Sequence, residues 1–274
     1  MFLLVFILER RDIMDFSITF IIVIFALGFI GSFISGLLGI GGAIIKFPML
    51  LFIPPLFGLT AFTAHEVSGI SAIEVFFASL SGVLAYRKGG YLNKDLIVYM
   101  GSAVLIGSFI GSYGSNFFSE NTINVVYGIL ALIAAVMMFI PRQNIDESVG
   151  QKLVFNRSLA SILAVIVGIG SGIVGAAGGF LLVPIMLTVL KIPTRITIAT
   201  SLAIAFISSI GSSVGKIITG QIEYGPAIIM IVASLIAAPL GAKVSKKMNT
   251  KVLQVLLAIM IAGTAIKIWI DILM

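Results

Sequence analysis

Long runs of apolar residues, separated by short polar stretches, dominate the sequence. Most of these runs approach or exceed the roughly 20 residues that a helix needs to cross a bilayer, but the second run in each half of the chain is short. The ten runs are 16–38, 43–57, 62–86, 95–118, 121–140, 158–175, 178–190, 196–219, 225–243 and 250–272. The pattern therefore predicts an all-α polytopic membrane protein with five membrane segments in each half.

Composition supports this class and excludes several others. The 274 residues are 59% hydrophobic and 10% charged, whereas soluble domains are about 45–50% apolar and about 25% charged. An outer-membrane barrel would show short alternating segments instead. With no cysteine and one histidine, the sequence predicts no cofactor, no metal site and no catalytic group, so we do not expect an enzyme. The net charge of +6 comes from short basic loops, which indicates membrane topology rather than nucleic-acid binding.

The two halves share one motif. The first copy, G-I-G-G-A-I-I-K-F-P-M-L, begins at Gly39, and the second, G-A-A-G-G-F-L-L-V-P-I-M-L, begins at Gly175. Such internal repeats are common in secondary transporters. We predict an N-terminal extension at residues 1–15, a first membrane repeat at 16–140 and a second membrane repeat at 158–274. A cytoplasmic connector, 141–157, would join the two repeats. Translation from Met14 would lead directly into the first apolar run and would remove the extension.

Loop charges predict that the two repeats are inverted. In the first half the loop at 87–94 is basic and the next, 119–121, has no base. In the second half the loop at 220–225 has no base, while the next, 243–251, carries four lysines. Because basic loops favour the cytoplasm, corresponding loops are expected on opposite sides of the membrane. The charges fit short segments that cross the membrane and short segments that re-enter equally well.

The glycine motifs predict helix ends inside the membrane. A short helix that follows each break would start near Gly41-Gly42 and near Gly178-Gly179. Helix N-termini expose free N–H groups with a partial positive charge, and glycine lets an anion approach them closely. Two such ends would form an anion cradle at mid-depth. The alternative is that these glycines serve close helix packing, which is our interpretation of Gly107 and Gly111.

These motifs resemble a known family. The second glycine motif, followed by Ala-Thr-Ser-Leu at 199–202, by Gly220 and by Leu-Gly-Ala at 240–242, is similar to the sulfite exporter TauE/SafE family of anion transporters. The resemblance covers nearly the whole chain from about Gly28. It implies secondary transport of sulfite, thiosulfate, sulfonates or related organic anions. The sequence departs from the family pattern where the first half has Ala-His-Glu-Val, at 64–67, in place of Ala-Thr-Ser-Leu.

Ionisable residues inside apolar runs are the candidates for proton coupling. Such residues are costly in a membrane and usually functional. His65 is the single histidine and can take up and release protons near neutral pH. Glu66 and Glu74 are eight positions apart and lie on one stripe of a helix. The alternative is that His65 and Glu66 begin a helix near the interface, where a first-turn Glu favours the helix dipole.

Three further polar residues are candidates for binding the substrate. Lys46 lies about one turn after the first glycine break and can face the anion or extend to the interface. Thr200 and Ser201 can donate hydrogen bonds to an oxyanion or to their own helix backbone. Lys216, near the end of its apolar run, is expected to reach the interface.

Together these features predict a multi-pass protein of the cytoplasmic membrane that moves small anions by alternating access. Its partners would be the anion, membrane lipid and a coupling ion, with the proton as one candidate, and we expect no nucleic acid. An uncoupled anion channel built on the same fold is the main alternative. An intramembrane enzyme or a scaffold is a weaker one, because the sequence offers no nucleophile–base pair.

Overall fold

The computed structural model describes residues 17–41, 43–87, 89–138, 153 and 155–273. The predicted extension at 1–15 and nearly all of the connector at 141–157 lie outside these ranges. Every element in the described residues is a helix. They are α2 (Ile18–Leu38), α3 (Ala43–Leu56), α4 (Ala64–Tyr86), α5 (Lys94–Gly114), the short 3-10 helix η1 (Ser115–Phe117), α6 (Glu120–Met138), α7 (Arg157–Val174), α8 (Gly179–Thr188), α9 (Thr194–Ile218), α10 (Tyr224–Lys247) and α11 (Thr250–Leu273).

The helices match the ten predicted apolar runs and confirm the polytopic α-helical class. In the described residues eight helices are long and apolar enough to cross a membrane, and the two short ones are those that follow the glycine breaks, α3 and α8. One prediction needs correction at its boundary. Lys243, Lys246 and Lys247 belong to the last turns of α10 rather than to a loop, because the chain stays helical as far as Lys247.

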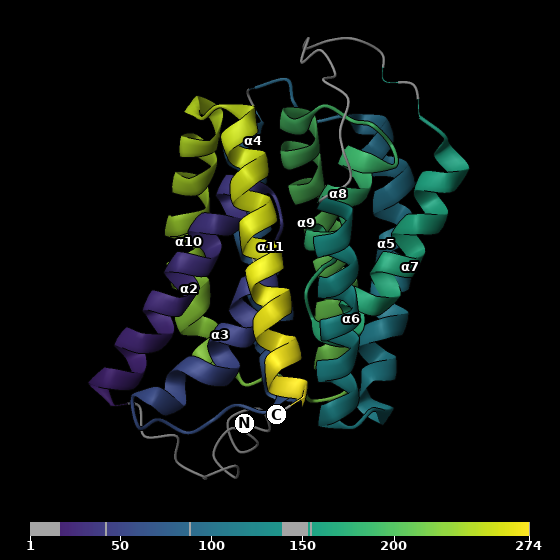
Figure 1. Ribbon diagram of the computed structural model, residues 1–274. Helices are drawn as coiled ribbons and strands as arrows, with labels where there is room; N and C mark the ends of the chain where they lie inside the picture. The colour runs from purple at the N-terminus through teal and green to yellow at the C-terminus, as the bar shows by residue number, and fades with distance from the viewer. Residues whose placement is uncertain (1–16, 42, 88, 139–152, 154, 274) are drawn as a thin grey trace, which may run out of the picture.

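The short helices turn back instead of crossing the bundle. Figure 1 shows α3 in the lower half of the molecule, returning to the end at which α2 begins. It shows α8 in the upper half, returning to the end at which α7 begins. Each pair, α2–α3 and α7–α8, is therefore a re-entrant hairpin, and the two hairpins enter from opposite ends. The glycine breaks form the tips of these hairpins.

Helices of one half pack against helices of the other half. Closely packed pairs are α5 with α7 and α10 with α2, while α4 lies against α9 and α6 against α11. Glycines allow the close approach. A Cβ on Gly36 would overlap Ala238 of α10, and a Cβ on Gly111 would overlap Ile169 of α7. This confirms the packing interpretation of Gly107 and Gly111, both of which face α7 within the same chain.

The structure also fixes which positions of the two halves correspond. Gly39 and Gly175 end α2 and α7 with φ of 75° and 74°. Counted from the helix starts, Ala64 in α4 and Thr194 in α9, Ser68 corresponds to Ile198. These two residues pack against Gly175 and Gly39, respectively.

This register corrects one prediction from the sequence. Thr200-Ser201 is equivalent in position to Ile70-Ser71 and not to His65-Glu66. The mismatch arises because α3 has 14 residues whereas α8 has 10. In addition, seven residues, 57–63, join α3 to α4, whereas five, 189–193, join α8 to α9. The ionisable pair therefore does not replace the hydroxyl pair at a shared place in the fold.

Candidate functional site: the junction of the two broken helices

Left-handed glycines break both hairpins in the same way. Gly39 donates its N–H to Ser35 and ends α2, while Gly175 donates to Ser171 and Gly172 and ends α7. A second left-handed residue follows two positions later in each copy, Gly41 with φ of 71° and Ala177 with φ of 51°. The new helices then begin at Ala43 and Gly179. The starts of α3 and α8 are as the glycine motifs predict, although Gly42 itself lies outside the described residues.

The two breaks meet in the centre of the molecule. A Cβ on Gly179 would lie 2.6 Å from the carbonyl carbon of Ile40 and 2.9 Å from the amide nitrogen of Gly41. Gly41 faces Val75 of α4 and Ala205 of α9: a Cβ added to Gly41, here called its virtual Cβ, would lie 3.7 Å from each of these side chains. Because Val75 and Ala205 hold equivalent places in the two repeats, the junction lies where the two halves meet.

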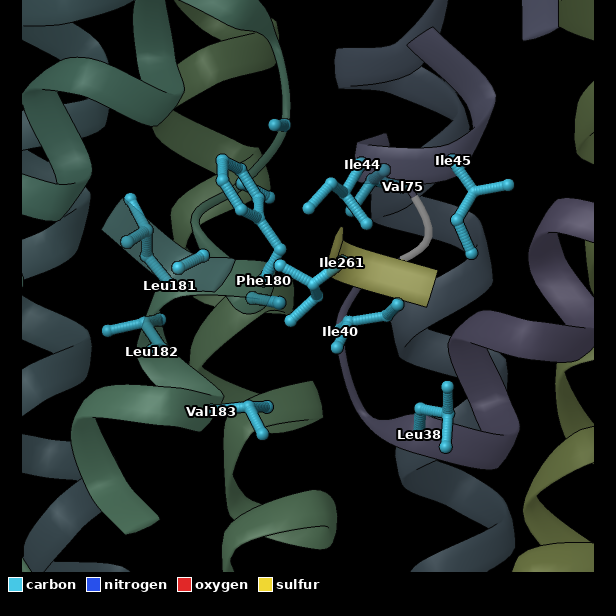
Figure 2. Packing of buried hydrophobic residues seen from close by; sticks show 14 of the residues in the cluster. Leu38, Ile40, Ile44, Ile45, Val75, Phe180, Leu181, Leu182, Val183 and Ile261 are labelled. Atoms are coloured by element: carbon cyan, nitrogen blue, oxygen red, sulfur yellow. The ribbon is translucent and has the colours of Figure 1, made fainter. Parts of the chain in front are cut away.

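Apolar side chains surround this junction. Figure 2 shows Phe180 of α8 and Ile44 of α3 in this region, together with Ile40 and Ile261. All four side chains are buried. Polar backbone groups in such surroundings need partners, since an unpaired amide in an apolar medium costs several kcal/mol. The first N–H groups of α3 and α8 have no acceptor within their own helices, so they are able to donate hydrogen bonds to a ligand.

The two hydroxyl candidates lie at different places. Ser201 donates a hydrogen bond to the carbonyl oxygen of Gly39 (2.8 Å) and so contacts the first break directly. Thr200 instead accepts a hydrogen bond from the Asn93 amide (3.1 Å) and donates to the carbonyl of Tyr91 (3.3 Å). Ser201 is thus part of the junction, whereas Thr200 holds the loop before α5.

A buried ion pair lies beside the junction. The Lys46 ammonium donates to the Glu74 carboxylate and to the hydroxyl of Ser32 (3.5 Å), and Ser32 donates to the other carboxylate oxygen of Glu74 (2.6 Å). The side chains of Lys46 and Glu74 have no exposed surface, so the alternative that Lys46 extends to the interface is wrong. Glu74 is near the middle of α4 and precedes Val75, which contacts Gly41.

The three candidates for proton coupling are not brought together. Glu66 closes a capping box, accepting from the Thr63 amide (2.8 Å) while the Thr63 hydroxyl accepts from the Glu66 amide (3.2 Å). His65 contacts Gln221 (3.2 Å) and the carbonyl of Phe118 (3.0 Å) and has Glu120 at 3.9 Å. Both residues lie in the first turn of α4, as the interfacial alternative predicts, and of the three only Glu74 lies beside the junction.

Sequence reasoning misplaced one further cation, Lys216. It is completely buried, not extended to the interface as expected. Its ammonium donates to Ser68, Ser115 and Gln221, each at 2.7 Å, and to the carbonyl of Ile173 (3.3 Å). No carboxylate among the described residues forms an ion pair with it. The one sequence signal for this site is Gln221, a hydrogen-bond acceptor five positions after Lys216.

Several known proteins similar to this chain are named as probable membrane transporters. Residues 24–268 match the family model described as sulfite exporter TauE/SafE. The probable membrane transporter protein YunE of Bacillus subtilis is 28% identical over 260 residues, which cover 88% of this chain and 94% of YunE. A probable membrane transporter protein of Methanocaldococcus jannaschii is 27% identical over 241 residues, covering 84% and 88% of the two chains. No solved structure matches the chain significantly.

Proposed function

Because the chain belongs to the sulfite exporter TauE/SafE family of membrane transporters, we propose that it moves small anions across the cytoplasmic membrane by alternating access. The anions would be sulfite, thiosulfate, a sulfonate or a related organic anion. The binding site would lie at the junction of the broken helices, where Gly41, Gly178 and Gly179 keep the helix ends accessible. Ser201 and Lys46 would supply the neighbouring hydroxyl and cation.

One observation carries this proposal: two helix N-termini meet at the centre of the bundle, with their backbones in contact at Gly179 and Ile40. Each N-terminus exposes N–H groups and about half a unit of positive charge. Two of them at mid-depth favour an anion where lipid and apolar side chains otherwise exclude one. The buried Lys46 adds a full positive charge beside them.

Alternating access would follow from inverted repeats. The hairpins α2–α3 and α7–α8 enter from opposite ends (Figure 1), and helices of the two halves pack in matching pairs, such as α5 with α7 and α10 with α2. If one hairpin with its supporting helices moves against the other, the junction opens toward one end and then toward the other. The lysines of α10 and the basic loop before α5 lie at the same end, which would be the cytoplasmic one.

Single cysteines test the inverted arrangement, since the chain contains no cysteine of its own. Thr60 precedes α4 and Val189 follows α8, and both side chains are exposed. We expect an impermeant maleimide to label the Thr60→Cys variant on intact cells and the Val189→Cys variant only after permeabilisation. Labelling of both variants from the same side would contradict the inverted repeat.

Anion uptake into proteoliposomes tests the function itself. We expect purified protein to take up at least one of sulfite, thiosulfate, sulfate or methanesulfonate with saturable kinetics. Gly179→Ala should abolish uptake, because its Cβ would lie 2.6 Å from the Ile40 carbonyl. Gly114→Ala is the matched control, since nothing lies within 4 Å of its virtual Cβ. Unsaturable, conductive flux would indicate a channel, and no flux with any anion would refute the proposal.

A further inference from the structure

We propose that the Lys46–Glu74 ion pair couples anion transport to protons: protonation of Glu74 releases the Lys46 ammonium, which then binds the anion. This inference rests on the proposed function and assigns its coupling step. In the proton-transfer step a proton from the aqueous phase forms an O–H bond on the Glu74 carboxylate. The ammonium of Lys46 keeps all three of its protons and exchanges one negative partner for another.

The first support is the placement of the pair. Lys46 is in the first turn of α3, immediately after the break, and its stem packs against Gly31 of α2. Glu74 reaches the pair from α4, and Ser32 joins it from α2. All three side chains are fully buried. The pair thus connects the re-entrant hairpin of the first repeat to a helix that lines the junction.

The second support is a comparison inside the molecule. In the second repeat the positions equivalent to Ser32, Lys46 and Glu74 are occupied by Gly168, Leu182 and Ile204. Leu182 and Ile204 are also fully buried. The same site in the same fold is therefore filled with apolar side chains, so the ion pair is not needed for packing. Since a buried ion pair is usually no more stable than an apolar replacement, its presence in one repeat indicates function.

The third support is a set of hydroxyls with unused hydrogen-bonding capacity. Ser35 follows Ser32 by one turn of α2, and Ser71 precedes Glu74 by one turn of α4. Both hydroxyls are buried, and neither has a hydrogen-bond partner within the described part of the chain. Residues three apart lie on one side of a helix. These hydroxyls are therefore available, close to the pair, to an oxyanion that displaces the Glu74 carboxylate.

Charge balance requires the proton and the anion to move together. The empty site is neutral, because Lys46 and Glu74 compensate each other. The site that holds one proton on Glu74 and one monovalent anion on Lys46 is neutral as well. A site with only the proton or only the anion carries an uncompensated charge inside the membrane, which is costly. The neutral forms are the ones able to change conformation, so proton and anion cross together.

Other titratable groups near α4 are engaged elsewhere or lie at helix ends. From α6, the hydroxyl of Tyr127 donates to the Ile44 carbonyl. From α9, Lys216 contacts Ser68, which is six positions before Glu74. The sequence of α2 contains no titratable side chain. The remaining groups that flank α4 lie near helix ends: His65, Glu66, Tyr86, Glu120, Arg157, Arg195, Tyr224, Lys243, Lys246 and Lys247.

The test is uptake of methanesulfonate into proteoliposomes, since this monovalent anion stays ionised across the neutral pH range. For the wild type we expect an inward proton gradient to drive accumulation, with the rate rising as the external pH falls. Glu74→Gln resembles the protonated state, so it should retain anion counterflow but lose accumulation driven by the gradient. Lys46→Leu should lose both.

His65→Gln is the matched control, because it removes the other candidate for proton binding, and it should keep the proton response. The size-exclusion profile and thermal stability of each variant confirm folding. Gradient-driven accumulation by Glu74→Gln at the wild-type level would overturn the inference, as would loss of coupling in His65→Gln alone. Saturable but proton-independent uptake by the wild type would overturn the coupling and leave the proposed function intact. No uptake of methanesulfonate would overturn the inference, and failure with sulfite, thiosulfate and sulfate as well would refute both.

Discussion

Replacing Lys46 alone with leucine should destabilise the protein by about 3–5 kcal/mol, because it leaves the buried Glu74 carboxylate without its cation. The double substitution Lys46→Leu/Glu74→Ile installs the residues that the second repeat already carries at these places. Exchanging a whole buried pair for apolar residues is often neutral or stabilising by about 1–4 kcal/mol. We therefore expect the double variant to be at least as stable as the wild type, although it should not transport.

The measurement is the free energy of unfolding from denaturant titration in mixed micelles. Glu74→Ile alone is the reciprocal control, because among the described residues it leaves the buried Lys46 ammonium with only Ser32 as a partner. If both single variants and the double variant are equally stable, Lys46 and Glu74 do not interact in the protein. If the double variant is the least stable of the three, the ion pair has a structural role after all.

Replacing Gly175 with alanine should be the most damaging exchange of a single small residue. Gly175 has a φ of 74°, and its Cβ would overlap the Ser68 carbonyl, with the carbonyl carbon at 2.7 Å. The left-handed conformation costs alanine about 1–2 kcal/mol, and the overlap adds about 1–3 kcal/mol. The overlap forces α4 away from the second hairpin, so both stability and uptake should fall.

Gly220→Ala separates these two effects. Gly220 has a φ of 67°, and nothing lies within 4 Å of its virtual Cβ. It should therefore show only the conformational cost, with normal uptake. The comparison uses the unfolding midpoint in detergent and the initial rate of anion uptake for both variants. Equal losses in the two variants would mean that the contact between Gly175 and Ser68 does not matter.

The membrane segments could be read directly from the sequence. All ten apolar runs correspond to helices in the structure, and the short helices begin where the glycine motifs place them. These features are local, since a run of apolar residues and a glycine that accepts a positive φ act through their immediate neighbours. The family resemblance rests on the same local motifs, and it holds over residues 24–268.

The site was only partly predictable. Glu66 and Glu74 share a helix stripe, yet Glu66 caps the start of α4 while Glu74 binds a lysine 28 positions before it. Helical periodicity describes which residues of one helix lie together, but it says nothing about the residue that another helix presents. The same limit applies to Lys216, whose partners Ser68 and Ser115 lie more than 100 positions away.

The sequence by itself therefore determined the membrane class, the glycine motif that both halves share, the two breaks and the family. The tertiary structure decided that the short helices re-enter and that their tips meet, because a re-entrant and a crossing segment have the same length and composition. It also decided that Lys46 pairs with Glu74 and that Thr200-Ser201 and His65-Glu66 are not equivalent. In an apolar interior a charged group must find a partner, and the packing of helices distant in sequence determines which one it finds.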